Sequence, residues 1–389
     1  MKVAIVSEFY PRAHDPVLGI WAHRQALAAR DAGVDVRVLV LHRPVPPRST
    51  RLRDAPAALR TLAAQPRRVV LDGLDVRYVP FFAPPRSRTY GSWGAWAAPT
   101  LARALRRLRA EFPYDLVHAH NAVPAADAVL RARVGAPLVV SVHGGDVYFT
   151  APRYAAGARA VRRALGDARL VLANSAGIED AARDLGARHT RVVRLGTDVP
   201  DQLPHKAPAP TVVTVAHLVA RKRHADVVRA VWLLRERHPL LRYLIVGDGP
   251  EREPLARLAA ELGLADRVEL TGQLPREEAL ARARAAHVFV MPSVDEAFGV
   301  AYVEAMAAGL PAVGARGEPG PQEIAGAGDG LRLVPPADVE ALAAELDALL
   351  AEPAYLHELG ERARATVTAA FTWERCGHDT VAAYEDALR

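Results

Sequence analysis

The chain has 389 residues, which is long enough for two domains of ordinary size. Hydrophobic residues make up 50% and charged residues 24%, a composition that excludes an intrinsically disordered chain. No window approaches the roughly 18 consecutive apolar residues of a spanning helix, and the apolar stretch at residues 2–7 is too short for a secretory signal. The single cysteine, Cys376, forms no intramolecular disulfide, so we expect a cytoplasmic protein.

The net charge of +6 conceals two halves of opposite sign. Residues 1–200 contain 30 Lys and Arg against 16 Asp and Glu, whereas residues 201–389 contain 20 against 28. One interpretation of this asymmetry is an anionic partner for the first half, such as an anionic membrane surface or a lipid phosphate. The alternative is a high-GC genome that uses arginine in place of lysine, which gives no reason for the two halves to differ in sign. Nucleic acid is not expected, because only Trp93 and Trp96 could serve as an aromatic platform there.

Strand-like and helix-like stretches alternate along the first half. Strands are expected at 2–7, 34–41, 115–118, 137–142, 169–173 and 191–195, and helices at 19–32, 123–133, 154–165 and 175–185. Continuously apolar strands that alternate with helices predict an α/β fold with a parallel sheet covered on both faces.

Residues 199–210 interrupt this pattern with four prolines in twelve residues, which is typical of a linker. A second series then follows, with strands at 211–216, 241–246, 267–270, 287–291 and 311–313, and helices at 224–238, 251–262, 276–285 and 300–308. We therefore predict two Rossmann-like domains, residues 1–198 and 211–372. Ligands of such sheets bind at the carboxyl ends of the strands, so the site is expected in the cleft between the domains.

The stretch 43–109 departs from the alternation and is rich in arginine and proline. Within 86–109, one helical face carries Leu101, Leu105 and Leu108, the remaining positions carry arginines, and Trp93 and Trp96 lie just upstream. Two interpretations stay open. This is either a basic amphipathic helix at a membrane interface, or an ordinary surface helix whose leucines face the core.

Glu296 and Glu304 are eight residues apart, around a turn that precedes a helix. Glu296 is expected on the loop after a strand, and Glu304 inside the following helix. Free N–H groups are expected at Phe298, Gly299 and Val300, where they and the helix dipole suit a diphosphate. Since carboxylates accept pairs of sugar hydroxyls, the two glutamates would hold the hexose and the ribose of a nucleotide sugar. The alternative is two ordinary exposed helix glutamates.

The segment around these glutamates, 291–313, reads MPSVDEAFGVAYVEAMAAGLPAV and resembles the signature of the retaining GT-B glycosyltransferases of family 4. Other segments match the family in order, namely SVHGGDV (141–147), ANSAG (173–177), RVVRLGTD (191–198), HLVARKRH (217–224), VGDGPER (246–252) and DRVELTGQL (266–274). The C-terminal FTWERCGHDTVAAYEDAL resembles the family's closing segment, which implies that residues 373–389 pack back on the first domain. The resemblance implies a GT-B fold, with two Rossmann-like domains facing each other across a cleft.

The resemblance also implies roles for individual residues. Glu296 would contact the hydroxyls of the transferred sugar, and Glu304 would hold the ribose. Arg221 and Lys222 would neutralise the diphosphate as charge builds on it during bond cleavage. His143, in the HG-x-D segment, would lie near the reacting carbon or the acceptor.

Further donor-binding positions implied by the resemblance are Gly19, Gly249 and Leu274, and candidate acceptor residues are His14 and Asp146. Two departures concern the phosphate loop. His217 stands where the family commonly has arginine, and Arg223 where it has glycine, so one permanent charge is missing. Arg221, directly before Lys222, is positioned in sequence to compensate.

The implied activity is the transfer of a hexose from a UDP- or GDP-linked sugar to a hydroxyl acceptor, with retention of anomeric configuration. No Asp-x-Asp motif occurs in the sequence, so we expect neither a metal nor another cofactor. The basic segment 86–109 favours a lipid-linked acceptor and a peripheral position on the inner face of the cell membrane. Two alternatives stay open, a GT-B sugar-nucleotide epimerase and a non-catalytic nucleotide-sugar-binding protein.

Overall fold

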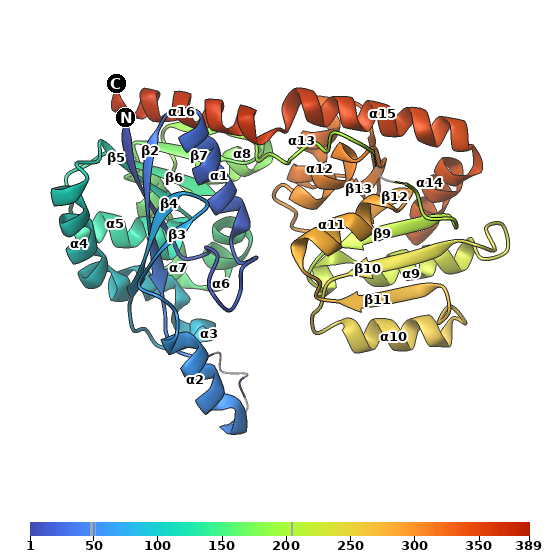
Figure 1. The fold of residues 1–389 in the computed structure, drawn as a ribbon, viewed down its shortest axis with the longest axis horizontal. Helices are drawn as coiled ribbons and strands as arrows, with labels where there is room; N and C mark the ends of the chain where they lie inside the picture. The colour runs from blue at the N-terminus through green and yellow to red at the C-terminus, as the bar shows by residue number, and fades with distance from the viewer. Residues whose placement is uncertain (47–49, 51, 204) are drawn as a thin grey trace. The chain divides into compact units, whose positions relative to one another are not determined.

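Two sheets organise the computed structural model, which describes residues 1–46, 50, 52–203 and 205–389. The chain divides into two units. The first comprises Met1–Leu195 with Trp373–Arg389, and the second comprises Gly196–Thr372 (Figure 1). The α/β prediction is confirmed, because each unit is a sheet of mainly parallel strands with helices in the connections.

The first unit contains an eight-stranded sheet in the order β3-β4-β2-β1-β5-β6-β7-β8. All neighbours pair in parallel except β3 and β4, which form an antiparallel hairpin. Its strands are β1 (Lys2–Ser7), β2 (Asp35–His42), β3 (Arg68–Leu71), β4 (Leu74–Pro80), β5 (Leu116–His120), β6 (Leu138–Val142), β7 (Leu170–Ala173) and β8 (Thr190–Val192). Its main helices are α1 (Ile20–Asp31), α2 (Ala55–Ala63), α3 (Arg86–Thr89), α4 (Trp93–Glu111), α5 (Asp127–Ala132), α6 (Ala151–Arg153), α7 (Ala155–Gly166), α8 (Ala176–Asp184) and α16 (Trp373–Leu388).

The central strands are almost completely buried because both faces of the sheet are covered. Every residue of β5 and β6 is buried, and only the first residue of β1 is not. The hairpin of β3 and β4 was absent from the sequence prediction, since it falls in the stretch 43–109. Its turn uses Asp72 and Gly73 at φ values of 48° and 83°, the left-handed conformations that a tight Asp-Gly hairpin turn requires.

Helix α4 resolves the two interpretations of the arginine-rich segment. Leu101, Leu105 and Leu108 are fully buried in the core of the first unit, so the leucine face is not free to enter a bilayer. Trp93 is also buried, whereas Trp96 is 52% exposed. The outward face of α4 carries exposed arginines at 103, 106, 107 and 109. The interpretation as an ordinary surface helix therefore describes α4.

Helix α16 returns to the first unit and packs along α1 (Figure 1). Gly377 permits this close approach, because a Cβ atom there would lie 2.3 Å from the carbonyl oxygen of Ala28. Gln25 donates a hydrogen bond of 3.1 Å to Thr380 at the same contact.

The second unit contains a six-stranded parallel sheet in the order β11-β10-β9-β12-β13-β14. Its strands are β9 (Thr211–Val215), β10 (Arg242–Val246), β11 (Val268–Gly272), β12 (Val288–Met291), β13 (Ala312–Ala315) and β14 (Leu331–Val334). Its helices are α9 (His224–Leu233), α10 (Arg252–Glu261), α11 (Arg276–Arg284), α12 (Val300–Ala307), α13 (Pro319–Ala327), α14 (Val339–Ala351) and α15 (Pro353–Ala370). When the six strands are numbered along the chain, they lie in the sheet in the order 3-2-1-4-5-6, the arrangement of doubly wound nucleotide-binding folds.

The proline-rich stretch 199–210 packs on the second unit where the structure describes it. The Ala207 N–H donates to the carbonyl of Ala285 at 2.7 Å, and Arg364 donates to the carbonyl of Pro200 at 2.6 Å. Among the helices of the described residues, none combines the length and hydropathy needed to cross a bilayer.

Candidate functional site

The predicted donor-binding residues other than Gly19 follow the carboxyl ends of four strands in the second sheet. Arg221 and Lys222 come after β9, Gly249 after β10, Leu274 after β11, and residues 296–300 after β12. Strands β9 and β12 are neighbours, and the strand order reverses between them. The loops at such a reversal form the ligand crevice of doubly wound sheets. The topology alone therefore brings the loops with Lys222 and Glu296 together.

A buried ion pair joins these two loops. The Nζ atom of Lys222 lies 2.5 Å from Oε2 of Glu296, and these residues are only 9% and 7% exposed. Nη1 of Arg221 lies 3.7 Å from the same carboxylate oxygen, and the Ser293 hydroxyl donates to it at 2.9 Å. One carboxylate thus holds two cations in place at the end of the sheet.

Backbone hydrogen bonds fix the loops that carry this pair. The Val294 N–H donates to the carbonyl of Arg221 at 2.9 Å, which ties the loop after β12 to the loop after β9. The Glu296 N–H donates to the Glu318 carboxylate at 2.8 Å, and the Gly320 N–H donates to the Glu296 carbonyl at 2.9 Å. The geometry of the pair is therefore preorganised by the fold.

The two charges of this pair stabilise each other. Burial on its own raises the pKa of Glu296, but Lys222 and Arg221 outweigh it and hold that pKa below its usual value. Burial lowers the pKa of Lys222, and the Glu296 carboxylate only partly offsets this effect. Removal of either partner would leave a buried charge without its main compensation.

Helix α12 begins directly after Gly299, which has φ 84° and is the N-terminal cap. The first N–H groups of a helix have no partner inside it, and at this end of α12 no capping side chain accepts a hydrogen bond from them. Phe298 is 2% exposed and packs against Phe371 with ring centroids 5.9 Å apart. The Phe298 side chain is therefore engaged in the core, and the expected contact of residues 298–300 with a ligand through their N–H groups stays a prediction.

Replacement of Gly299 by alanine is expected to destabilise the second unit by about 1–3 kcal/mol. A Cβ at this positive φ would lie 2.5 Å from the Tyr302 ring, so both the backbone and the ring must shift. Gly326→Ala in α13 is the matched control, because a Cβ there meets nothing within 4 Å. Denaturant unfolding measures both variants. Equal stability of Gly299→Ala and the wild type would contradict the expected strain.

Glu304 lies inside α12 and forms an ion pair with Arg276, whose Nη2 atom is 2.8 Å from Oε1 of Glu304. Arg276 belongs to the first turn of α11. Leu274, two residues earlier in the chain, is half-buried. A Cβ on Gly249 would lie 2.4 Å from the carbonyl oxygen of Leu218, so this glycine is needed for contact between the loops after β9 and β10. Sequence reasoning did not find Arg276, because only the tertiary fold places it beside Glu304.

His143 follows β6 in the first unit and forms a hydrogen bond with a second histidine. Its Nε2 atom is 3.0 Å from Nδ1 of His120, and the two rings are nearly coplanar at an interplanar angle of 4°. His120 was not predicted, although the alternation of His118 and His120 along a buried strand was an available signal. Burial lowers the pKa of His143 to about 4, so its imidazole is neutral at pH 7.

The other predicted residues of the first unit lie in the loops after β1 and β6. Asp146 is 1% exposed and accepts backbone N–H bonds from Ala122 at 2.8 Å and Val123 at 3.1 Å. Through these hydrogen bonds the Asp146 carboxylate joins two loops. Its contact with an acceptor stays a prediction. His14 is exposed in the loop after β1. Gly19 caps α1 at φ 64°, and a Cβ there would overlap the backbone of Phe9.

Stability is expected to fall as the pH decreases from 6.5 to 4, because of His143 and the other buried histidines. The unfolded chain binds a proton near the ordinary histidine pKa of 6.5, whereas folded His143 resists protonation until about pH 4. The unfolded state therefore holds more protons in this window. Asp146 acts in the opposite direction between about pH 4 and 6, since burial raises its pKa to about 6.

The pH effect of His143 is measured by denaturant unfolding at pH 7 and pH 5 in the wild type and in His143→Gln. The variant is expected to lose less stability over this interval, because one buried titrating group has been removed. Identical losses in the two proteins would show that His143 does not resist protonation as the geometry requires.

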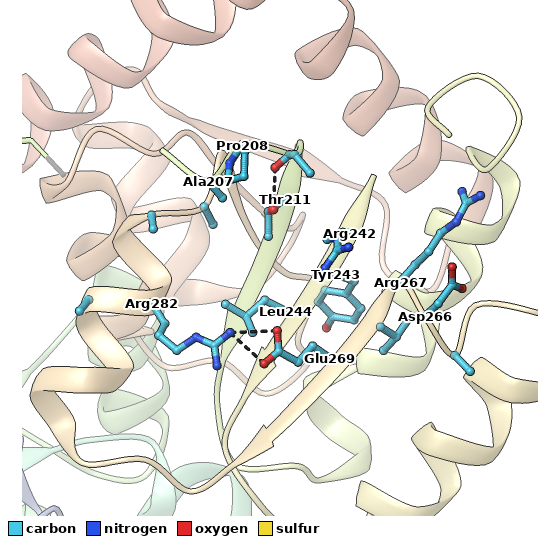
Figure 2. A pocket seen from close by; sticks show the side chains of 16 residues that line it. Ala207, Pro208, Thr211, Arg242, Tyr243, Leu244, Asp266, Arg267, Glu269 and Arg282 are labelled. Atoms are coloured by element: carbon cyan, nitrogen blue, oxygen red, sulfur yellow. Dashed lines mark hydrogen bonds and ion pairs between the residues drawn. The ribbon is translucent and has the colours of Figure 1, made fainter. Parts of the chain in front are cut away.

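A separate cavity of about 830 Å³ lies at the opposite end of the second sheet (Figure 2). Its lining includes Thr211, Arg242 and Val268, which are the first residues of β9, β10 and β11. Figure 2 shows the Arg282–Glu269 ion pair at its border, with nitrogen and oxygen 2.8 Å apart. None of the predicted site residues lines this cavity, and ligands of doubly wound sheets bind at the other end of the strands.

Comparison with known proteins gives two family matches that together span residues 19–366. The family described as "Glycosyl transferases group 1" matches residues 197–366, and "Glycosyl transferase 4-like domain" matches residues 19–197. The MMP alpha-(1->4)-mannosyltransferase of Mycolicibacterium hassiacum is 31% identical over 308 residues, which cover 74% of each chain. The GDP-mannose-dependent alpha-(1-6)-phosphatidylinositol monomannoside mannosyltransferase of Mycolicibacterium smegmatis is 31% identical over 311 residues, or 72% of this chain and 78% of the relative.

Solved structures share the fold over nearly the whole chain. Sucrose-phosphate synthase from Thermosynechococcus elongatus superposes with a TM-score of 0.79 at 23% identity and covers 99% of this chain and 98% of its own. HepE of Anabaena, solved in complex with UDP and glucose, has a TM-score of 0.72 at 21% identity and covers 99% of both chains. At these identities the likeness establishes the GT-B fold.

Proposed function

Because the chain belongs to the group 1 family of glycosyl transferases, we propose that it transfers a hexose from a nucleotide diphosphate-sugar to a hydroxyl acceptor with retention of anomeric configuration. The observation that carries the proposal is the buried cluster of Lys222, Arg221 and Glu296 where the strand order reverses. Next to this cluster, α12 begins without a side-chain cap.

Each part of the cluster has a proposed role. Lys222 and Arg221 bind the diphosphate, and the uncapped N–H groups of α12 supply further donors to its oxygens. Glu296 orients Lys222 and accepts hydroxyl hydrogens of the transferred sugar. In this proposal the two cations and the N–H groups of α12, in place of a metal ion, neutralise the leaving group. His143 contributes a neutral imidazole toward the reacting sugar or the acceptor hydroxyl.

The proposed reaction takes place on one face of the sugar. The bond between the anomeric carbon and the diphosphate oxygen breaks, and its electron pair leaves with the diphosphate. The acceptor oxygen then bonds to the anomeric carbon from the same face, and its proton passes to the departing phosphate. Fixed cations lower the barrier because negative charge grows on the diphosphate in the transition state.

UDP and GDP are the proposed donor nucleotides. HepE was solved with UDP, and the mycobacterial relative is described as GDP-mannose-dependent. We propose that Glu304 binds the ribose hydroxyls, which requires Arg276 to release or share this carboxylate when the donor enters. Arg276 would then be free to approach the nucleotide.

The proposed acceptor is a hydroxyl of a cell-surface glycan or glycolipid precursor, used at the inner face of the cell membrane. The support is the exposed arginine face of α4 and the excess of positive charge in residues 1–200. Since the leucines of α4 are buried, such a contact would be electrostatic and weakened by salt. Flotation with anionic vesicles tests this proposal, and absence of binding at low ionic strength would contradict it.

The transfer reaction is tested with UDP-, GDP- and ADP-sugars, each supplied with and without a panel of hydroxyl acceptors. Release of nucleoside diphosphate that depends on acceptor, with an α- or β-linkage matching the donor by NMR, is the expected result. Isomerised sugar from the donor alone would instead identify an epimerase. Donor binding without turnover under any acceptor would identify a binding protein.

A further inference from the structure

Glu318 stands directly before α13, but its side chain does not cap that helix. It occupies the N-terminal cap position, and it accepts no hydrogen bond from the first turn of α13. Instead, its Oε2 atom accepts the N–H of Glu296 at 2.8 Å, in the loop after β12. The N–H of Asp295 is a second backbone partner of the same carboxylate. Glu318 therefore holds a loop that is 22 residues away in the sequence.

The loop that Glu318 contacts contains a left-handed turn. Asp295 has φ 54°, a conformation that is uncommon for residues other than glycine. Consecutive N–H groups at such a turn can form a small concavity that binds anions. The Glu318 carboxylate fills this concavity through its hydrogen bonds to both N–H groups, and it thereby stabilises the turn.

Electrostatics alone would not favour a third carboxylate at this position. Burial raises the pKa of Glu318, and the charges of Asp295 and Glu296 add to this effect. The hydrogen bonds from the two N–H groups oppose it, because they stabilise the ionised form. The contact with the loop is therefore what compensates for a glutamate beside two other acidic side chains.

The same turn also contacts the loop that carries the two cations. Nη1 of Arg221 donates to the Asp295 carbonyl at 3.4 Å, and the Val294 N–H donates to the Arg221 carbonyl at 2.9 Å. The Glu296 carboxylate pairs with Lys222 and lies 3.7 Å from Arg221. A shift of this backbone would thus move both the Glu296 carboxylate and one of the acceptors of Arg221.

A second contact fixes the loop after β13 against the loop after β12. The Gly320 N–H donates to the Glu296 carbonyl at 2.9 Å, and a Cβ on Gly320 would lie 2.2 Å from the Phe298 carbonyl oxygen. Because this approach leaves no room for a side chain at residue 320, the backbone itself sets the distance between Glu318 and the turn.

We propose that Glu318 is a positioning residue, whose carboxylate holds the turn at 295–296 and thereby fixes Glu296 for the transferred sugar and Arg221 for the diphosphate. In this role Glu318 contacts neither the sugar nor the diphosphate. The kinetic part of this inference rests on the proposed function, whereas the hold on the turn does not.

Amide hydrogen exchange in the ligand-free, full-length protein tests the hold on the turn. In Glu318→Ala, the amides of Asp295 and Glu296 are expected to exchange about 10- to 100-fold faster, because each loses a hydrogen bond to a charged group. The Phe289 amide in β12, which donates to the Pro311 carbonyl, is expected to keep its rate. Unchanged exchange of Asp295 and Glu296 in a folded Glu318→Ala would overturn the proposal, whether or not the protein proves to be a glycosyltransferase.

Kinetics separate positioning from a role in folding alone. Glu318→Ala is expected to lower kcat about 10²-fold, because Glu296 and Arg221 lose their alignment. Glu318→Gln is expected to lose less, since its amide oxygen can still accept one of the two N–H groups. In the Glu296→Gln background, Glu318→Ala is expected to cause little further loss, because both residues then act on the same group. The exposed Glu340→Gln in α14 is the control, with an expected wild-type kcat.

Equal losses of kcat from Glu318→Ala in the two backgrounds would overturn the proposal, because Glu318 would then act independently of Glu296. If Glu318→Ala does not fold, Glu318→Gln takes its place in both experiments, with smaller expected changes in the same direction. Absence of transfer by the wild type with every donor would contradict the proposed function, and the exchange measurement would still decide the role of Glu318.

Discussion

Replacement of Lys222 by methionine is expected to lower kcat for sugar transfer by about 10²–10³-fold, equivalent to about 3–4 kcal/mol of transition-state stabilisation. Methionine keeps much of the side-chain volume but removes the charge 2.5 Å from Glu296. Of the two cations, only Arg221 would then stabilise the growing charge on the leaving diphosphate. The measurement is steady-state transfer with saturating donor.

The same substitution is expected to lower the free energy of unfolding by about 3–5 kcal/mol, because it leaves the Glu296 carboxylate buried without its main partner. Arg229→Met is the matched control. Arg229 is an exposed cation in the same unit, 3.3 Å from Asp226, and its loss is expected to have a small effect because Asp226 keeps its ion pair with Arg223. A wild-type kcat in Lys222→Met would show that Lys222 takes no part in the reaction, whatever the effect of the substitution on stability.

Replacement of Glu296 by glutamine is expected to reduce transfer as strongly as the loss of Lys222. Glutamine can still accept the Ser293 hydrogen bond, but it loses the charge that orients Lys222 and Arg221. It is also a weaker acceptor for the hydroxyls of the sugar. Single-turnover transfer with preloaded donor separates this chemical effect from product release.

The double variant Lys222→Met with Glu296→Gln distinguishes stability from catalysis. Since neither charge is then buried alone, the free energy of unfolding is expected to recover toward the wild type. Transfer is expected to remain at the level of the single variants. Recovery of transfer together with stability would mean that the pair serves only the fold.

The sequence predicted the architecture well where strands are buried on both faces. The short apolar runs of β1, β6 and β10 favour buried strands, and their alternation with helices specified parallel sheets. The hairpin of β3 and β4 was missed because it lies in the arginine- and proline-rich stretch 43–109, and its charged residues Arg68, Asp75 and Arg77 break the apolar pattern. The leucines of α4 were ambiguous, because a core-facing stripe and a membrane-facing stripe have the same spacing.

The site residues likewise fall into those that the sequence predicted and those that only the structure reveals. Arg221, Lys222 and Glu296 were identified from local motifs, and the strand order explains why distant loops bring them together. The partners Glu318, Arg276 and His120 depend on contacts between segments that are separate in the sequence. Arg276, for example, is 28 residues from Glu304, and no local pattern indicates that these side chains meet.

Binding of nucleoside diphosphate to this cluster is the central claim, and a thermal-shift titration tests it most directly. UDP and GDP are added to the wild type, to Arg229→Met and to the double variant Lys222→Met with Glu296→Gln. A ligand at 100 times its Kd stabilises a protein by about 2.7 kcal/mol. We predict a rise in Tm for the wild type and Arg229→Met with one of the two nucleotides, and little or none for the double variant. An equal rise in all three proteins, or no rise in the wild type with either nucleotide, would contradict the account.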